Sequence, residues 1–143
     1  MAAEGRPVVL VIDDHAEYLE ALEFCLRDDF EVLTATSGLD GYALASERRP
    51  DVIVVDVMMP VVDGWTLLRK LKVNPAFANT PIIVCSAVSR AKVLSEVDPW
   101  QVSAVVQKPC DPGRIGQAIR SAIASRRSSA SKPERTLAPE TSS

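Results

Sequence analysis

Residues 8–14 read VVLVIDD, five consecutive apolar residues that run directly into two carboxylates. The pattern returns at 52–56 as VIVVD, further apolar-rich runs occupy 82–84 and 102–106, and residues 31–35 alternate more weakly. Uninterrupted apolar runs of this length are typical of strands buried on both faces, as in a parallel sheet covered by helices. The sequence therefore predicts five strands, of which residues 8–12 form the first.

Helical patterns lie between these runs. Leucines recur three and four apart at 19, 22 and 26, and the last segment places isoleucines at 115, 119 and 123. Asp111 is the expected N-cap of that last helix and Pro112 its first residue. Ser37 and Asp63 are the expected caps of the second and third helices, and a short fourth helix is expected at 89–97. Five alternating strand–helix units predict an α/β fold, a doubly wound (βα)5 sandwich with a five-stranded parallel sheet.

The overall composition fits one folded domain. The chain has 143 residues, of which 47% are hydrophobic and 24% are charged, and its formal net charge is −3. These values exclude a disordered or collagen-like chain. No apolar run approaches the roughly 20 residues of a membrane span, and residues 1–7 lack the apolar core of a secretory signal. Three cysteines without a spacing pattern are typical of a reducing compartment, so we expect a cytoplasmic protein with no membrane partner.

Residues 126–143 read RRSSASKPERTLAPETSS and differ in composition from the rest of the chain. They carry too few apolar residues to offset the ordering of their backbone. We therefore expect a domain at 1–125, with 12 bases and 17 acids, and a disordered Ser/Pro-rich tail at 126–143, with 4 bases and 2 acids. Four separated bases without an aromatic residue make a poor nucleic-acid arm, so no nucleic-acid partner is expected.

Polar residues end four of the predicted strands. Asp13 and Asp14 follow the first strand, Asp56 the third, Ser86 the fourth and Lys108 the fifth. Because ligands bind beyond the carboxyl ends of parallel strands, we expect these side chains to share one edge of the sheet. Three carboxylates in one place repel each other unless a cation joins them, and hard oxygen ligands favour Mg²⁺. A lysine, a hydroxyl and a carboxylate nucleophile are what an incoming phosphoryl group requires, with Asp56 as its acceptor.

These residues belong to four motifs that stand in order along the chain: Val11-Ile12-Asp13-Asp14, residues 56–60 (DVMMP) with Asp63-Gly64, Ser86-Ala87, and Lys108-Pro109. With them the sequence, from about residue 7 to 125, resembles the receiver domain of two-component response regulators, and in particular the stand-alone, chemotaxis-regulator-like members. The resemblance implies a flavodoxin-like fold and a role in a phosphorelay.

The resemblance also implies a role for each residue of the acidic cluster. Asp56 would accept a phosphoryl group from the phosphohistidine of a sensor kinase or phosphotransferase. Asp13, Asp14 and Asp56 would hold Mg²⁺, with the backbone carbonyl of Met58 completing the site.

The remaining motif residues would bind the phosphoryl group and respond to it. Lys108 would pair with its oxygens, Ser86 would donate a hydrogen bond to one of them, and Ala87 would leave room for the group. The bond before Pro109 is commonly cis in similar domains.

Four positions depart from the family pattern or are ambiguous. Val105 replaces the aromatic residue that usually transmits phosphorylation, so we expect the signal to pass instead through the fourth helix and its loop, which contains Trp100, to the fifth strand. Met58 and Val88 are apolar where a polar side chain could position an attacking water, which predicts a long-lived aspartyl phosphate. His15 is interpreted as an exposed residue at the start of the first helix, although it follows the acidic pair directly.

Several functional classes are compatible with a receiver-like domain. We expect a stand-alone regulator that binds a downstream target or a second copy through its fourth helix, fifth strand and fifth helix. Beyond self-phosphorylation and slow autodephosphorylation we do not expect an enzyme, because an aspartate-nucleophile phosphatase usually has a second Asp where Met58 stands. A receiver cut from a longer hybrid kinase or regulator is the second interpretation. The intact set of acids, hydroxyl and lysine argues against a scaffold that acts without phosphorylation.

Overall fold

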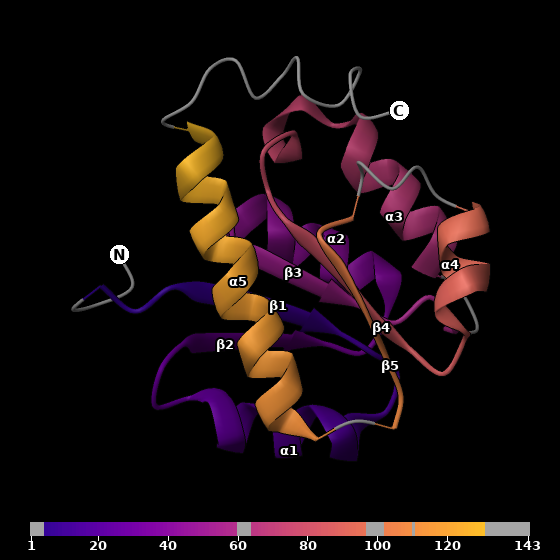
Figure 1. Ribbon diagram of the computed structural model, residues 1–143, viewed down its shortest axis with the longest axis horizontal. Coiled ribbons are helices and arrows are strands. Elements are labelled where there is room, and N and C mark those ends of the chain that lie inside the picture. Colours follow the sequence, from indigo (N-terminus) through magenta and orange to yellow (C-terminus); the bar gives the residue numbers. More distant parts are fainter. Residues whose placement is uncertain (1–4, 60–63, 97–101, 110, 131–143) are drawn as a thin grey trace.

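Five parallel strands form one sheet in the order β2-β1-β3-β4-β5 (Figure 1). The computed structural model describes residues 5–59, 64–96, 102–109 and 111–130. The strands are β1 (Val8–Ile12), β2 (Glu31–Ala35), β3 (Val52–Val55), β4 (Ile82–Ser86) and β5 (Ala104–Gln107). The helices are α1 (Ala16–Leu26), α2 (Gly38–Arg48), α3 (Gly64–Val73), the 3₁₀ turn η2 (Pro75–Phe77), α4 (Arg90–Glu96) and α5 (Pro112–Ala130). The predicted flavodoxin-like fold is confirmed.

Helices cover both faces of the sheet, as the apolar strands require. Helices α1 and α5 lie on one face, where Leu22 and Ile119 pack against Val9 and Val54. Helices α2, α3 and α4 lie on the other, where their apolar residues pack against Leu10 and the rest of that strand face (Figure 1). All four residues of β3 are buried, because this central strand has a neighbour on each side and helices above and below.

Two predicted boundaries are corrected by the structure. The last strand begins at Ala104 rather than Val102. Helix α5 continues to Ala130, so the predicted domain boundary at Ser125 falls inside a helix. The Arg126 guanidinium donates a hydrogen bond to the Asp51 carbonyl oxygen at 3.2 Å, which anchors this part of α5 to the start of β3. Arginine, serine and alanine also continue a helix without the break that proline would cause. Residues 131–143 of the predicted tail lie outside the described residues.

Side-chain caps begin three of the helices where the sequence places them. The Ser37 Oγ accepts a hydrogen bond from the Asp40 amide at 3.1 Å, and the Asp111 Oδ1 accepts one from the Arg114 amide at 2.9 Å. The Ser89 Oγ accepts a bond from the Lys92 amide at the start of α4. The expected cap Asp63 lies outside the described residues. These caps satisfy amide groups that the first helical turn leaves unpaired.

Replacing Ser37 with alanine is expected to lower the free energy of unfolding by about 1 kcal/mol, because the Asp40 amide loses its acceptor. Urea denaturation measures this change. The control is Ser46→Ala, an exposed position inside the same helix, which is expected to change stability by less than about 0.5 kcal/mol. Equal effects at the two positions would contradict the capping role.

Within the described ranges, none of the helices combines the length and the apolar character that crossing a bilayer demands.

Candidate functional site

The carboxyl ends of β1, β3, β4 and β5 carry the polar residues singled out in the sequence. The parallel ladder continues into them: the Asp56 amide donates to the Ile12 carbonyl at 3.0 Å, and the Lys108 amide to the Ser86 carbonyl at 2.8 Å. Asp13 is held in the same way by the Ala35 carbonyl of β2. The sheet therefore fixes the backbones of these residues at one edge, as the sequence predicted.

Lys108 joins the two buried carboxylates of the site. Its Nζ lies 2.6 Å from Asp13 Oδ2 and 3.1 Å from Asp56 Oδ2. The side chains of Asp13 and Asp56 are only 3% and 4% exposed, and that of Lys108 is 18% exposed. Burial lowers the pKa of Lys108, but its hydrogen bonds to both carboxylates and their negative charges outweigh burial and raise that pKa above its ordinary value. Lys108 is therefore a fixed positive charge beside the predicted acceptor.

Tyr18 is a third partner of Lys108 that was not predicted from the sequence. The Lys108 Nζ lies 4.4 Å from the centre of the Tyr18 ring, within the range of a cation–π interaction. The Tyr18 hydroxyl lies 3.4 Å from the Sγ of Cys85, a buried residue of β4. Tyr18 stands four residues before Leu22 on α1, so the helical period alone could have placed its ring toward the sheet.

Asp56 is positioned by backbone contacts as well as by the lysine. Its Oδ1 accepts a hydrogen bond from the Met58 amide at 2.8 Å. The first residue of α3, Gly64, packs directly on this segment: a Cβ there would lie 2.3 Å from the Asp56 carbonyl oxygen and 2.3 Å from the Val57 Cα. Close approach of two backbone segments is therefore the reason that this position requires glycine.

Asp14 and His15 complete the acidic cluster. The His15 amide and the His15 ring Nδ1 lie 2.9 Å and 2.7 Å from Asp13 Oδ1, and the same ring nitrogen is 3.3 Å from Asp14 Oδ1. The hydrogen bond to Asp13, together with the charges of Asp13 and Asp14, raises the pKa of His15 above its ordinary value. The side chain of His15 is 63% exposed at the N-cap of α1, as predicted, but its ring also contacts the cluster.

The donor set fits a divalent cation. Asp13, Asp14, His15 and Asp56 each offer a ligand atom, and these atoms lie within 4.8 Å of one another. The Asp14 Oδ1 is buried and accepts no hydrogen bond from any described residue, although it lies near the His15 ring. Three carboxylates are hard oxygen ligands, and a buried oxygen atom without a donor is stabilised when a cation binds it.

The other predicted site residues surround this cluster. Ser86 is 1% exposed and its Oγ accepts a hydrogen bond from the Val88 amide at 3.3 Å. Ala87 is exposed beside it, and the bond between Lys108 and Pro109 is cis. The Met58 side chain points outward and is 59% exposed. No contact in the described residues tests the predicted role of its carbonyl oxygen.

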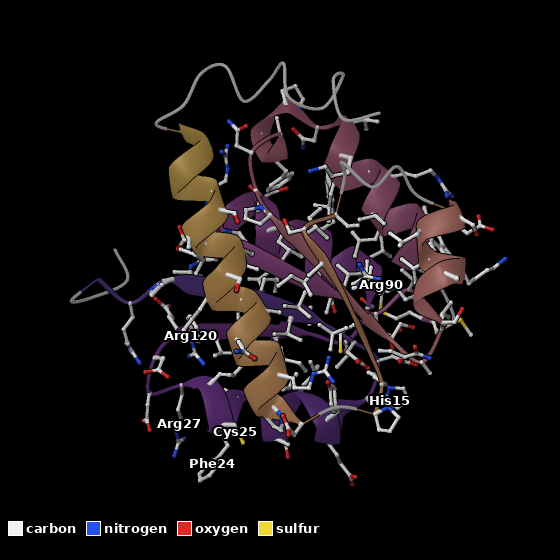
Figure 2. The ribbon with its side chains drawn as sticks, in the orientation of Figure 1. His15, Phe24, Cys25, Arg27, Arg90 and Arg120 are labelled. Carbon is white, nitrogen blue, oxygen red and sulfur yellow. The ribbon has the colours of Figure 1, made fainter. Side chains whose placement is uncertain are left out.

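Val105, the predicted variant position, is half-buried on β5 and packs against the core. Figure 2 shows Arg90 reaching from α4 toward this strand, where its guanidinium donates to the Val105 carbonyl at 3.4 Å. Pro60, Asp63, Trp100 and Cys110, which also entered the sequence predictions, lie outside the described residues.

Comparisons with known proteins identify the family of this chain. Residues 9–120 match the family model of the response regulator receiver domain. The sensor histidine kinase TmoS of Ectopseudomonas mendocina is 36% identical over 95 residues, which are 64% of this chain and 10% of TmoS. The transcriptional regulatory protein PrrA of Mycobacterium tuberculosis is 43% identical over 84 residues, 58% of this chain and 35% of PrrA. The crystal structure of the chemotaxis response regulator CheY4 of Vibrio cholerae superposes with a TM-score of 0.75 and 26% identity, covering 81% of this chain and 98% of CheY4.

The chain spans only 10% and 35% of the two curated relatives, so the similarity concerns one domain of each. The family model covers most of the chain, from the first strand into the last helix. The chain therefore belongs to the response regulator receiver domain family.

Proposed function

We propose that this chain is a phosphoacceptor that receives a phosphoryl group on Asp56 from the phosphohistidine of a sensor kinase or phosphotransferase. The observation that carries the proposal is the ammonium of Lys108, placed between the buried carboxylates of Asp56 and Asp13. When Asp56 carries a phosphoryl group, the ammonium in this position can exchange its contact with the Asp56 carboxylate for a contact with the phosphoryl oxygens.

In the transfer step, a carboxylate oxygen of Asp56 forms a bond to phosphorus while the phosphorus–nitrogen bond of the donor breaks. The electron pair of the broken bond leaves with the donor imidazole. Lys108 compensates charge on the phosphoryl oxygens, and the hydroxyl of Ser86 can donate a hydrogen bond to one of them. Asp13, Asp14 and Asp56, with the Met58 carbonyl, would hold a Mg²⁺ ion, which supplies positive charge where the anionic groups meet.

Phosphorylation would then alter what the domain binds. A groove of about 620 Å³ lies between β5 and α5, lined by residues such as Val105, Arg114 and Gln117. Helix α4 joins the same surface through the hydrogen bond from Arg90 to the Val105 carbonyl. A downstream target or a second copy of the chain would dock on this face, formed by α4, β5 and α5. With Val105 in place of an aromatic ring, α4 is the element that would carry the change.

An enzymatic role on an external substrate is less well supported. The residue two positions after Asp56 is Met58, whose thioether cannot act as a general acid or base. We therefore propose a signalling domain rather than a phosphatase. The similarity to part of a sensor histidine kinase keeps a role within a hybrid kinase as the second candidate.

The test is labelling with acetyl phosphate in the presence of Mg²⁺, read by intact-protein mass spectrometry. Wild type is expected to gain one phosphoryl group, and Asp56→Asn is expected to gain none. The control is Asp28→Asn, an exposed acid beyond the opposite end of α1 from Asp13 and Asp14, which is expected to label like wild type. Label retained on the Asp56→Asn protein would overturn the assignment.

The lifetime of the phosphorylated form is a separate prediction. The Met58 and Val88 side chains cannot hold a water for attack on phosphorus, so the aspartyl phosphate of wild type is expected to persist for minutes or longer. Because Met58 is exposed, Met58→Asn changes the polarity there without opening the core, and it is expected to shorten the lifetime several-fold. Loss of the wild-type label within seconds after removal of acetyl phosphate would contradict this prediction.

A further inference from the structure

His15 places the only imidazole of the 143-residue chain inside the acidic cluster. It is the N-cap of α1, and its carbonyl accepts the Leu19 amide at 3.1 Å, so the first turn of the helix fixes its backbone. Figure 2 labels His15 at this start of α1. The ring Nδ1 lies against the carboxylates, at 2.7 Å from Asp13 Oδ1 and 3.3 Å from Asp14 Oδ1.

The ring is not needed to orient Asp13. The Asp13 Oδ1 already accepts the His15 backbone amide at 2.9 Å, and its Oδ2 accepts the Lys108 ammonium at 2.6 Å. A backbone donor is present with any side chain at position 15. The imidazole therefore adds something that the carboxylates lack, which is a nitrogen atom with a lone pair once its proton is displaced.

Nitrogen and oxygen donors prefer different ions. Mg²⁺ selects oxygen ligands and gains little from an imidazole, whereas affinity for imidazole-containing sites rises from Mn²⁺ through Co²⁺ to Ni²⁺. A site with three carboxylates and one imidazole consequently ranks divalent ions differently from a site with carboxylates alone.

We propose that His15 is a fourth side-chain ligand of the metal site, beside the three carboxylates, and gives it a preference for late first-row divalent ions over Mg²⁺. This inference rests on the proposed function, because it uses the same cation site at Asp13, Asp14 and Asp56. The imidazole nitrogen coordinates the ion directly, and the ring moves from its carboxylate contacts to do so. The class of ligand is a late first-row divalent ion such as Ni²⁺ or Co²⁺.

The first test measures the binding of Ni²⁺ and of Mg²⁺, each added separately, by titration calorimetry. The protein carries no affinity tag, and the pH is about 8, where a free imidazole is neutral. The variants are His15→Gln and Asp14→Asn. The His15→Gln protein is expected to bind Ni²⁺ about tenfold more weakly or worse, and Mg²⁺ within about threefold of wild type. If His15→Gln weakens the binding of both ions equally, or of neither, the proposal is overturned. A ring that acts only through its charge or through Asp13 would change the affinity for Ni²⁺ and for Mg²⁺ by the same factor.

The second test detects the nitrogen itself. Mn²⁺ is added to wild-type protein, and electron spin echo modulation is compared between natural protein and protein with ¹⁵N-labelled histidine. Modulation from a directly bound nitrogen, which changes with the label and disappears in His15→Gln, is the expected result. Its absence from wild type overturns the role of His15.

The variant Asp14→Asn separates failure of this inference from failure of the proposed function. It removes the orphaned carboxylate oxygen of the cluster and is expected to weaken both ions. If Mg²⁺ binding is lost in Asp14→Asn but no nitrogen is detected in wild type, only the inference about His15 fails. If Mg²⁺ does not bind wild type, or binds independently of Asp14, the proposed metal site itself is wrong. If Ni²⁺ binds independently of Asp14, for example at the exposed Cys25, the inference fails as well.

Discussion

Replacing Gly64 with alanine is expected to lower the free energy of unfolding by about 3 kcal/mol or more. A Cβ at this position would lie 2.3 Å from both the Asp56 carbonyl oxygen and the Val57 Cα. Both atoms are backbone, so no rotamer change can relieve the overlap. Either α3 moves away from the end of β3, or the Asp56 segment moves.

Urea denaturation followed by circular dichroism measures the loss. Gly113→Ala is the matched control, because the new Cβ would meet only the Asp111 Oδ1 at 3.3 Å, and alanine is the better helix former. That control is expected to keep or slightly raise stability. If the Gly64→Ala protein is as stable as wild type, α3 does not pack closely against the Asp56 segment.

Replacing Lys108 with methionine is expected to lower the free energy of unfolding by about 3 kcal/mol in EDTA. The ammonium is the partner of two carboxylates that are 3% and 4% exposed, and the substitution leaves their charges buried without it. Methionine keeps nearly the length of the lysine side chain and its packing on the Tyr18 ring, so the loss of charge dominates the change in stability. The measurement is again urea denaturation.

The same variant is expected to respond more strongly to Mg²⁺ than wild type does. Removing Lys108 frees Asp13 and Asp56 oxygens for the ion, and an ion that binds only the folded state adds about 2.7 kcal/mol at one hundred times its Kd. Lys92→Met is the control, since Lys92 pairs with Glu96 on the exposed surface of α4 and contributes less than about 0.5 kcal/mol. If EDTA and Mg²⁺ give the same stability for Lys108→Met, the cation does not bind between these carboxylates.

The sheet and its helices could be predicted because the physical signals are local. Apolar runs such as residues 52–55 are buried on both faces in the structure, and the caps Ser37 and Asp111 accept the amide bonds that their positions imply. The convergence of Asp13, Asp56 and Lys108 followed from the parallel direction of the strands alone. No knowledge of side-chain conformation was needed for it.

The missed features depend on side-chain direction and on contacts between distant segments. The rings of His15 and Tyr18 both turn toward the cluster, and no spacing rule sets the direction of a loop side chain such as His15. The domain boundary was placed at residue 125, inside α5, because composition cannot show that Arg126 contacts the Asp51 carbonyl, 75 residues away in the sequence. Gly64 belongs to one of the sequence motifs, but only the packed structure shows which backbone it approaches.

The ion pair between Lys108 and Asp13 joins residues 95 positions apart in the chain. Closing so long a loop is entropically costly and depends on the intervening strands being in place. A chain that has formed only its first three strands holds the acidic residues but not the ammonium that balances them. On the proposed function, only the fully folded domain would therefore accept a phosphoryl group, so acetyl phosphate labelling during refolding would report the arrival of β5.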